Sequence, residues 1–199
     1  MTENAEYSEG FADNNGVRIF YRDYGPVSGD PVLMVHGLGA QLVHWPPHLI
    51  NFLQAHNFRP ITYDNRDVGL SSRFVGTPSF ILDYIKYFLR IPIKSEYTID
   101  DMADDGIKLL EQLKINQAHV LGTSMGGMIA QIISAQYPQK VKSFTLIAST
   151  ASTPSPMNAP TKPVRKLMLE RSKNPDASVE DVIKREIKIV SLIGIKGRV

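Results

Sequence analysis

The sequence predicts an α/β fold in which helices cover both faces of a mostly parallel sheet. Two observations lead to this prediction: strand patterns alternate with helical patterns along the first 150 residues, and the helical patterns each carry one apolar face. The composition is that of a globular domain, with 43% apolar and 21% charged residues in a chain of 199. Such a chain is long enough to bury a single core.

The first elements are a hairpin and a strand–helix–strand series. Residues 7–24 predict the hairpin, because an Asn-Asn-Gly sequence between two strand-like runs favours a tight turn with positive φ. A short apolar strand follows at 31–37. Helix 43–55 and strand 58–64 then begin the alternation that a parallel sheet requires.

The next elements complete a βαβαβ pattern. Residues 98–115 predict a helix with Thr98 as its N-cap and with apolar residues on one face. A strand at 118–122 leads into a helix whose apolar residues recur at steps of three and four, from Met128 to Tyr137. A strand at 143–149 closes the series. This order is typical of a parallel sheet covered by helices.

From residue 151 the pattern changes. The stretch ASTPSPMNAPTKP contains four prolines and several small polar residues, so regular structure is expected to stop there. Two helical patterns follow at 164–173 and 178–193, and no strand pattern returns. We therefore expect a boundary between residues 1–150 and residues 151–199.

Composition excludes several classes of function. With 22 basic and 20 acidic residues the net charge is only +2, and the scattered basic residues do not indicate a nucleic-acid surface. The absence of cysteine excludes disulfides, thiolate catalysis and cysteine-ligated metals. The N-terminus lacks the order of a secretory signal, and no apolar run approaches the roughly 20 residues that span a bilayer. We expect a cytoplasmic protein without a membrane span.

A serine at the junction of a strand and a helix is the principal candidate for catalysis. Gly122-Thr123-Ser124-Met125-Gly126 matches G-x-S-x-G, the pattern of a nucleophile elbow. In this sharp turn, side chains two residues before or after the serine would collide with the neighbouring strand and helix, which explains both glycines. A serine that only caps a helix would not need the second glycine.

The loop after the strand at 31–37 is the candidate oxyanion hole. Attack on an acyl carbon places negative charge on the carbonyl oxygen, and fixed backbone N–H groups stabilise it. We expect the amides of Met125 and Leu38 to donate to that oxygen, with Gly37 and Trp45 as candidates for the substrate pocket. A dinucleotide fingerprint in the same loop is excluded, because its third glycine position is Leu42.

Four motifs in order, HGLGA, YDNRDVGLSS, TIDDMADD and GTSMGGMIAQ, resemble the α/β-hydrolase superfamily. More narrowly, they are similar to bacterial esterases and to lactone or methyl-ester hydrolases, including aclacinomycin methylesterase-like proteins. The resemblance implies a serine hydrolase acting on a small-molecule ester or lactone through an acyl-enzyme on Ser124, without cofactor or metal. It also implies that residues 1–150 are the N-terminal part of the core and residues 151–199 a linker and the start of a helical cap.

The sequence departs from this family in the position of its histidines. The family order is nucleophile, then acid, then histidine, yet all five histidines precede Ser124. We expect His36 to be a satisfied structural residue and His56 and His119 to lead away from the site, whereas His44 and His48 remain weak alternatives for the base.

The missing partners lead to two expectations. We expect the chain to be the N-terminal portion of a longer hydrolase, with the triad acid and histidine absent and with negligible turnover of its own. We also expect the strand at 143–149 to be an open, apolar sheet edge.

Other functions stay open. A non-catalytic binding protein of the same fold is the alternative from another class, and a peptidase, a perhydrolase or a C–C bond hydrolase would use the same fold. Serine in place of aspartate at the elbow disfavours dehalogenase and epoxide-hydrolase chemistry.

Three further features have structural interpretations that we favour. Asp64, Arg66 and Asp67 are expected to tie their own loop together, since a partly buried guanidinium needs paired acceptors. The aspartates between 100 and 105 are expected to complement a helix dipole rather than to bind a metal. The aromatic segment 79–90 is expected to be a core or insertion helix, with an interfacial or cap-packing helix as the alternative.

Overall fold

A computed structural model describes residues 6–74 and 95–151, together with isolated positions between 162 and 188. The chain divides into two compact units, Met1–Ala151 and Ser152–Val199. The aromatic segment 79–90 lies outside the described residues, as does most of the expected linker and cap.

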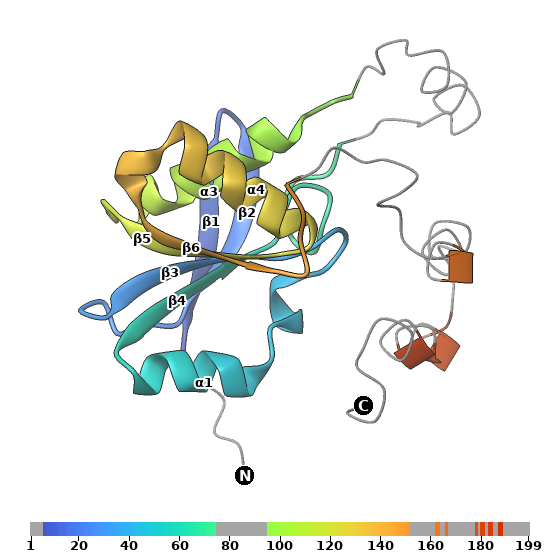
Figure 1. Cartoon of the computed structure of the whole chain (residues 1–199), viewed down its shortest axis with the longest axis horizontal. Coiled ribbons are helices and arrows are strands. Elements are labelled where there is room, and N and C mark those ends of the chain that lie inside the picture. The colour runs from blue at the N-terminus through green and yellow to red at the C-terminus, as the bar shows by residue number, and fades with distance from the viewer. Residues whose placement is uncertain are drawn as a thin grey trace. The chain divides into compact units, whose positions relative to one another are not determined.

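The first unit contains one six-stranded sheet in the order β1-β2-β4-β3-β5-β6 (Figure 1). β1, β2 and β4 are joined by antiparallel pairing, whereas β4, β3, β5 and β6 run parallel to one another. The strands are β1 Ser8–Asn14, β2 Val17–Asp23, β3 Asp30–Val35, β4 Phe58–Tyr63, β5 Ala118–Thr123 and β6 Val141–Ile147. The prediction of a mostly parallel sheet is confirmed.

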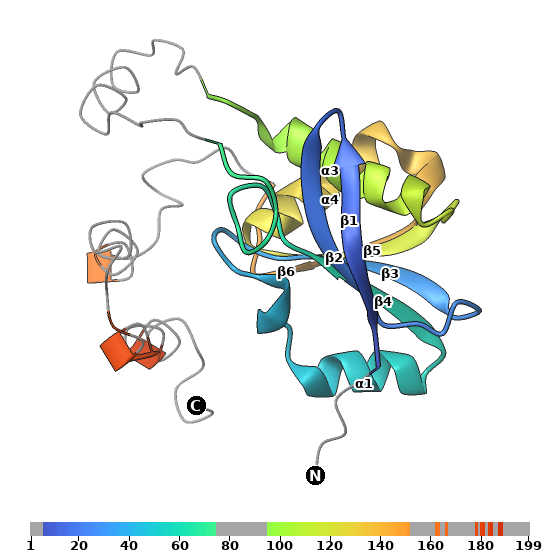
Figure 2. The ribbon, with the colours of Figure 1, turned by 180° about the vertical axis from the view of Figure 1, so that it is seen from behind.

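Helices cover both faces of this sheet. α1 (Pro47–Ala55) packs on one face, and α3 (Ile99–Gln112) and α4 (Met125–Gln136) pack on the other (Figures 1 and 2). β3 serves both layers: Leu33 and Val35 belong to the larger apolar cluster with α3 and α4, while Val32 and Met34 belong to the smaller cluster with α1. Burial on both faces explains why this strand is apolar throughout.

Two element boundaries illustrate what the local sequence determines. The helix expected from residue 43 begins only at Pro47, and Leu42–His44 form a short 3-10 helix instead. Proline suits the first position of a helix because its missing N–H would have no partner there. The N-cap prediction is confirmed, since the Thr98 hydroxyl accepts a hydrogen bond from the Asp101 amide at 3.2 Å.

β6 forms one edge of the described sheet, and its apolar side chains are exposed. Phe144, Leu146 and Ile147 are 50%, 37% and 44% exposed. The expectation of an open apolar edge at this strand is confirmed for the described residues.

In the second unit, the described positions between 180 and 188 are helical. The Ser178 hydroxyl accepts a hydrogen bond from the Asp181 amide at 3.2 Å, which is the arrangement of a helix N-cap. Across the part of the chain that the structure describes, no helix has the length and apolar character needed to span a membrane.

Candidate active site

Ser124 occupies the single position between the end of β5 and the start of α4. Its backbone has φ 51° and ψ −119°, a conformation that residues with a Cβ rarely adopt. The Ser124 amide donates to the Ile147 carbonyl at 2.9 Å, and the residue is exposed. The chain therefore makes a sharp turn that presents this side chain at the carboxyl end of β5.

The two glycines of the motif stand where the backbones approach most closely. A methyl group on Gly122 would lie 2.6 Å from the Gly126 carbonyl carbon and closer still to its oxygen. A methyl group on Gly126 would lie 2.6 Å from the Val35 carbonyl carbon. Any side chain at either position would displace backbone, so the steric explanation of the pattern is confirmed.

A third glycine has a different neighbour. Gly127 lies one residue beyond the motif, in the first turn of α4. The side chain of Ser149 lies against it, and a methyl group on Gly127 would collide with the Ser149 Cβ and Oγ. No sequence pattern predicts this contact, because it depends on the backbone at the end of β6.

The loop after β3 lies beside the serine. Gly37 is buried, and a methyl group on it would stand 3.2 Å from the Ser124 Cβ and 3.8 Å from its Oγ. Leu38, the next residue, is 67% exposed. Within residues 6–74 and 95–151, neither the Leu38 amide nor the Met125 amide donates a hydrogen bond. Gly37 thus lies against Ser124. Leu38 and Met125 line one cavity.

That cavity has a volume of about 620 Å³. Both Leu38 and Met125 contribute to its wall, which is otherwise built from the loops after β3 and β4 and from the start of α3 with the residues just before it. The remaining lining residues are Gly39, Arg66, Asp67, Val68, Ser95, Tyr97, Thr98, Ile99 and Met102. Its size is in the range of small-molecule sites.

Trp45 lies elsewhere. It is 5% exposed and packs in the apolar cluster with Met34 and Ile50 under α1. Its ring stands 4.3 Å from the His36 ring, centroid to centroid, and it is not part of the lining of the cavity. The structure therefore places Trp45 in the apolar layer beside His36 rather than in the wall of the cavity.

His36 only partly meets the expectation of a satisfied residue. Its Nδ1 accepts a hydrogen bond from the Gly37 amide at 3.3 Å, but its Nε2 is buried without a partner among the described residues. Burial and the neighbouring His44 lower the pKa of His36 to about 4. The ring is therefore neutral near pH 7, and one of its two nitrogens has a partner among the described residues.

None of the histidine hydrogen bonds in the described structure reaches Ser124. The Nδ1 of His44 accepts from the Gln41 amide at 3.0 Å, and the Nδ1 of His56 lies 2.8 Å from the Phe52 carbonyl oxygen. His119 lies between Asp30 and Ser143 near the opposite ends of the strands, at 3.2 and 2.7 Å. His48 is exposed on α1.

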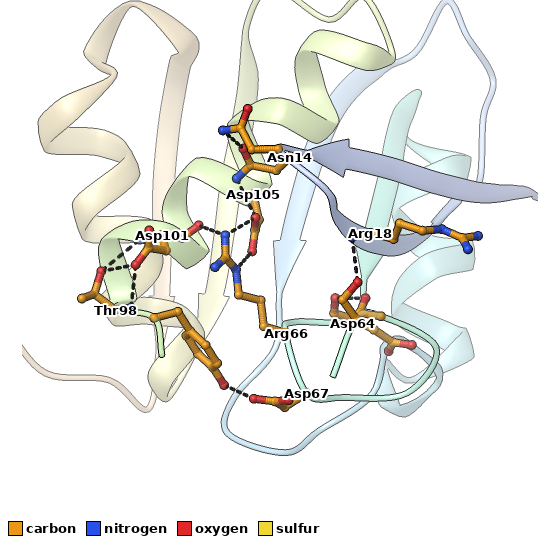
Figure 3. A network of polar contacts seen from close by, with 12 residues as sticks. Asn14, Arg18, Asp64, Arg66, Asp67, Thr98, Asp101 and Asp105 are labelled. Carbon is orange, nitrogen blue, oxygen red and sulfur yellow. Dashed lines mark hydrogen bonds and ion pairs between the residues drawn. The ribbon is translucent and has the colours of Figure 1, made fainter. Parts of the chain in front are cut away.

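A buried ion pair holds Arg66, one of the residues that line the cavity; Figure 3 shows the pair. Arg66 donates to both carboxylate oxygens of Asp105 on α3, from Nε at 2.6 Å and from Nη2 at 2.9 Å. Asn14 donates to the same carboxylate at 2.8 Å. Burial opposes the guanidinium charge, but the bonds to Asp105 prevail and raise the pKa of Arg66.

The neighbouring aspartates also hold the loop. The Asp64 carboxylate accepts from the Leu42 amide at 2.8 Å and from the Leu70 amide at 3.0 Å. Asp67 accepts from the Tyr97 hydroxyl at 2.6 Å, and burial together with this bond raises the pKa of Tyr97 to about 12. Asp64 and Asp67 thus tie their own loop together, at the amides of Leu70 and Phe74, whereas Arg66 binds α3 instead.

The aspartates of α3 have separate partners, and the dipole explanation was incomplete. Asp101 completes the capping box with Thr98. The others bind Gln136 (Asp100), Tyr137 (Asp104) and Arg66 (Asp105). The sequence analysis did not predict the Arg66–Asp105 pair. The only sign of it in the sequence is that the two oppositely charged residues stand in neighbouring motifs.

Comparison with known proteins decides the family. The family model described as alpha/beta hydrolase fold matches residues 30–181. The chain belongs to the alpha/beta hydrolase fold family. BpoC of Mycobacterium tuberculosis, named as a candidate non-heme bromoperoxidase, is 32% identical over 67% of this chain and 42% of its own length.

Two further α/β-hydrolase relatives have names that refer to esters and lactones. The rhodomycin D methylesterase DauP of Streptomyces sp. (strain C5) is 26% identical over 68% of this chain and 40% of its own length. Est816, named as an N-acyl homoserine lactone degrading enzyme, superposes with a TM-score of 0.58 at 25% identity, covering 92% of this chain and 66% of its own. The chain spans about two fifths of the length of the curated relatives it matches.

Proposed function

We propose that Ser124 is the nucleophile of a carboxylic ester or lactone hydrolase. The observation that carries the proposal is the strained backbone of Ser124, an exposed residue set between a buried strand and a helix N-terminus. Such a strained backbone persists only where the surrounding structure holds it in place. Here the missing side chains of Gly122 and Gly126 let the neighbouring backbones pack closely around the turn.

The reaction would be an acyl transfer in two halves. The Ser124 Oγ attacks the acyl carbon, and the hydroxyl proton passes to a base as the tetrahedral intermediate forms. The amides of Leu38 and Met125 would donate to the oxyanion, since both residues line a common cavity and both amides lack partners in the described structure. The base returns this proton to the leaving alcohol oxygen, which in a lactone stays tethered to the acyl group, and an acyl-serine remains. Water then gives up a proton to the base and attacks the acyl carbon, and Ser124 Oγ recovers the proton as the acid is released.

The base is the part of the site that this chain does not supply. No histidine follows Ser124 in the sequence, and no described histidine bonds to it. A serine hydroxyl without a base is a weak nucleophile near neutral pH. We therefore expect negligible ester turnover from the 199-residue chain alone.

The names of the relatives support the substrate class. DauP is a methylesterase and Est816 degrades a lactone. Cleavage of an ester or of a lactone ring begins with nucleophilic attack on an acyl carbon. The cavity of about 620 Å³ suits a small molecule. We further propose that residues 151–199 are a linker and the first part of a helical cap, and that the protein is cytoplasmic.

An added base tests the assignment of Ser124. The chain would be incubated with p-nitrophenyl acetate, with and without imidazole, and acylated sites located by peptide mass spectrometry. Because Ser124 is exposed, imidazole can reach it, and we expect acetylation of Ser124 only when imidazole is present. Ser134→Ala, on the same helix, serves as the matched control that keeps this modification, and Ser124→Ala should abolish it.

A non-catalytic binding protein remains the second candidate, and the lack of a histidine bonded to Ser124 favours it. A pure binder would show no acetylation or fluorophosphonate labelling of Ser124 under either condition. Ester turnover by the 199-residue chain that Ser124→Ala removes would instead contradict the expectation that the base is missing. Peptidase, perhydrolase and C–C hydrolase activities would be separated by their own substrates once Ser124 is shown to react.

A further inference from the structure

The chain segment that leaves β6 lies against the elbow and has a strained residue of its own. Ala148 has φ 49°, almost the same value as the 51° of Ser124. The residue before it, Ile147, accepts the hydrogen bond from the Ser124 amide at 2.9 Å. The residue that precedes one strained position therefore binds the amide of the other, although the two lie far apart in the sequence.

The residue after Ala148 makes the second connection. The Ser149 hydroxyl donates to the Ser124 carbonyl at 2.7 Å. This carbonyl also accepts from the Gly127 amide at 2.9 Å, in the first turn of α4. Residues 147 and 149 thus bind Ser124 at both its amide and its carbonyl, in addition to the bonds that its carbonyl accepts from α4.

Gln131 extends the same contact by one turn of α4. Its Nε2 donates to the Gly127 carbonyl at 3.1 Å and to the Thr150 carbonyl at 3.2 Å. The first turn of α4 and residues 147–150 consequently form one hydrogen-bonded unit.

Gly127 is required by this arrangement. A methyl group on it would collide with the Ser149 Cβ and Oγ, while the next nearest atom, the Gly122 carbonyl oxygen, would be 3.4 Å away. The space that the third glycine leaves is therefore occupied by the residue that binds the Ser124 carbonyl.

We propose that Ser149 is a positioning residue that holds Ser124 in its strained conformation through the Ser124 carbonyl. The inference rests on the proposed role of Ser124 as nucleophile. Helical hydrogen bonds alone would allow Ser124 to relax toward helical φ and ψ. The Ser149 hydroxyl lies outside the helix and opposes this relaxation. The strained backbone of Ala148 directs the Ser149 side chain to the Ser124 carbonyl.

The absence of cysteine gives a direct experiment on the chain. Ser124→Cys would carry the only thiol, at the N-terminus of α4, where the thiol pKa falls below its ordinary value of about 8.5. The apparent thiol pKa would be measured from the pH dependence of iodoacetamide alkylation. This readout needs no histidine and no ester turnover.

The comparison is between Ser149→Ala and Ser134→Ala, each in the Ser124→Cys background. Ser134 is the matched control, since its hydroxyl also donates to a backbone carbonyl at 2.7 Å, that of Ala130 on α4. We expect Ser149→Ala to raise the thiol pKa by about half a unit and to slow alkylation at pH 7 about threefold. Ser134→Ala should leave both unchanged, and circular dichroism should show both variants folded.

A second variant approaches the contact from the other side. Gly127→Ala adds a favourable helix former to α4 but displaces Ser149, so alkylation should slow although the helix is retained. In the Ser149→Gly background the same substitution should have no further effect, because the side chain it displaces is gone.

The outcomes are separable. A Ser124→Cys thiol that titrates near 8.5 would overturn the proposed elbow, and the inference with it. A lowered thiol pKa that neither Ser149→Ala nor Gly127→Ala changes would overturn the role of Ser149 alone. Equal effects of Ser149→Ala and Ser134→Ala would also overturn it, because the effect would then not be specific to the elbow.

Discussion

At the scale of single residues, the site depends on what small side chains allow. The buried Gly37 faces the Ser124 side chain, and its backbone is not in the left-handed region. The backbone at this position can accommodate an alanine. The added methyl group would therefore act mainly by displacing the Ser124 side chain. At 3.2 Å from the Ser124 Cβ, that methyl group requires a shift of a few tenths of an ångström.

We therefore predict that Gly37→Ala lowers reactivity at residue 124 with little loss of stability. In the Ser124→Cys background, alkylation should slow by about threefold as the side chain moves away from the helix N-terminus. Gly10→Ala is the control, since its methyl group would approach the Tyr21 hydroxyl to 3.1 Å far from the site. Unchanged alkylation in Gly37→Ala would show that Ser124 tolerates the methyl group without moving.

His36 predicts a pH dependence of stability. Burial first and His44 second lower its pKa from 6.5 to about 4 in the folded chain. The unfolded chain therefore binds a proton that the folded chain does not as the pH falls through 6.5. The contribution of His36 is fully present above pH 6.5 and is lost progressively between pH 6.5 and about 4.

Urea unfolding at a series of pH values measures this effect. We expect His36→Gln to flatten the fall in unfolding free energy over that window, relative to the unsubstituted chain. His56→Gln is the comparison, because His56 is exposed at the C-terminal end of α1, where its ring stacks on Phe52 and its Nδ1 lies 2.8 Å from the Phe52 carbonyl oxygen. If the unfolding free energy of His36→Gln fell as steeply over this pH range as that of the unsubstituted chain, another group would be responsible for the acid sensitivity.

At the scale of elements, the Arg66–Asp105 pair connects three parts of the fold. Arg66 extends from the loop after β4, Asp105 lies on α3, and Asn14 at the end of β1 shares the carboxylate (Figure 3). The two charged side chains are 7% and 1% exposed. Removal of one partner would leave the other charge buried without compensation.

We predict that Arg66→Met lowers the free energy of unfolding by about 3–5 kcal/mol, as measured by urea denaturation. Lys108→Met breaks an exposed ion pair with Glu111 on the same helix and should be far less destabilising than Arg66→Met, because solvent screens that pair. The double variant Arg66→Met/Asp105→Leu should be less destabilised than the sum of the two single variants. Additive losses would indicate that the two side chains act independently.

The same elements show how far sequence alone could reach. The alternation of strands and helices, the Thr98 N-cap and the elbow glycines were predictable because local rules determine them. Arg66 and Asp105 were each recognised without their pairing, because that pairing depends on how α3 packs against the loop after β4. Ser149 was missed entirely, since its contact with Ser124 depends on the positive φ of Ala148, which no local rule predicts for alanine.

At the scale of the whole molecule, the described sheet has two unlike edges. The β1 edge belongs to a tight antiparallel hairpin and carries charged side chains, among them Glu9, which pairs with Arg22. The β6 edge belongs to the parallel part and carries Phe144, Leu146 and Ile147, all exposed. Parallel strands are ordinarily buried on both faces, so the exposure of β6 departs from the pattern seen in β3.

This exposure predicts that the 199-residue chain associates with itself in solution. An edge strand offers N–H and C=O groups to other chains, and exposed apolar side chains on it strengthen that pairing. We expect sedimentation velocity to show concentration-dependent association that Phe144→Lys weakens by about tenfold, since lysine on an edge strand opposes pairing. Phe52→Lys is the matched control, because Phe52 is 58% exposed but lies on α1, which has no free edge. Equal weakening by both substitutions would assign the association to general surface hydrophobicity, and a monomer at every concentration would show that β6 is not available for pairing.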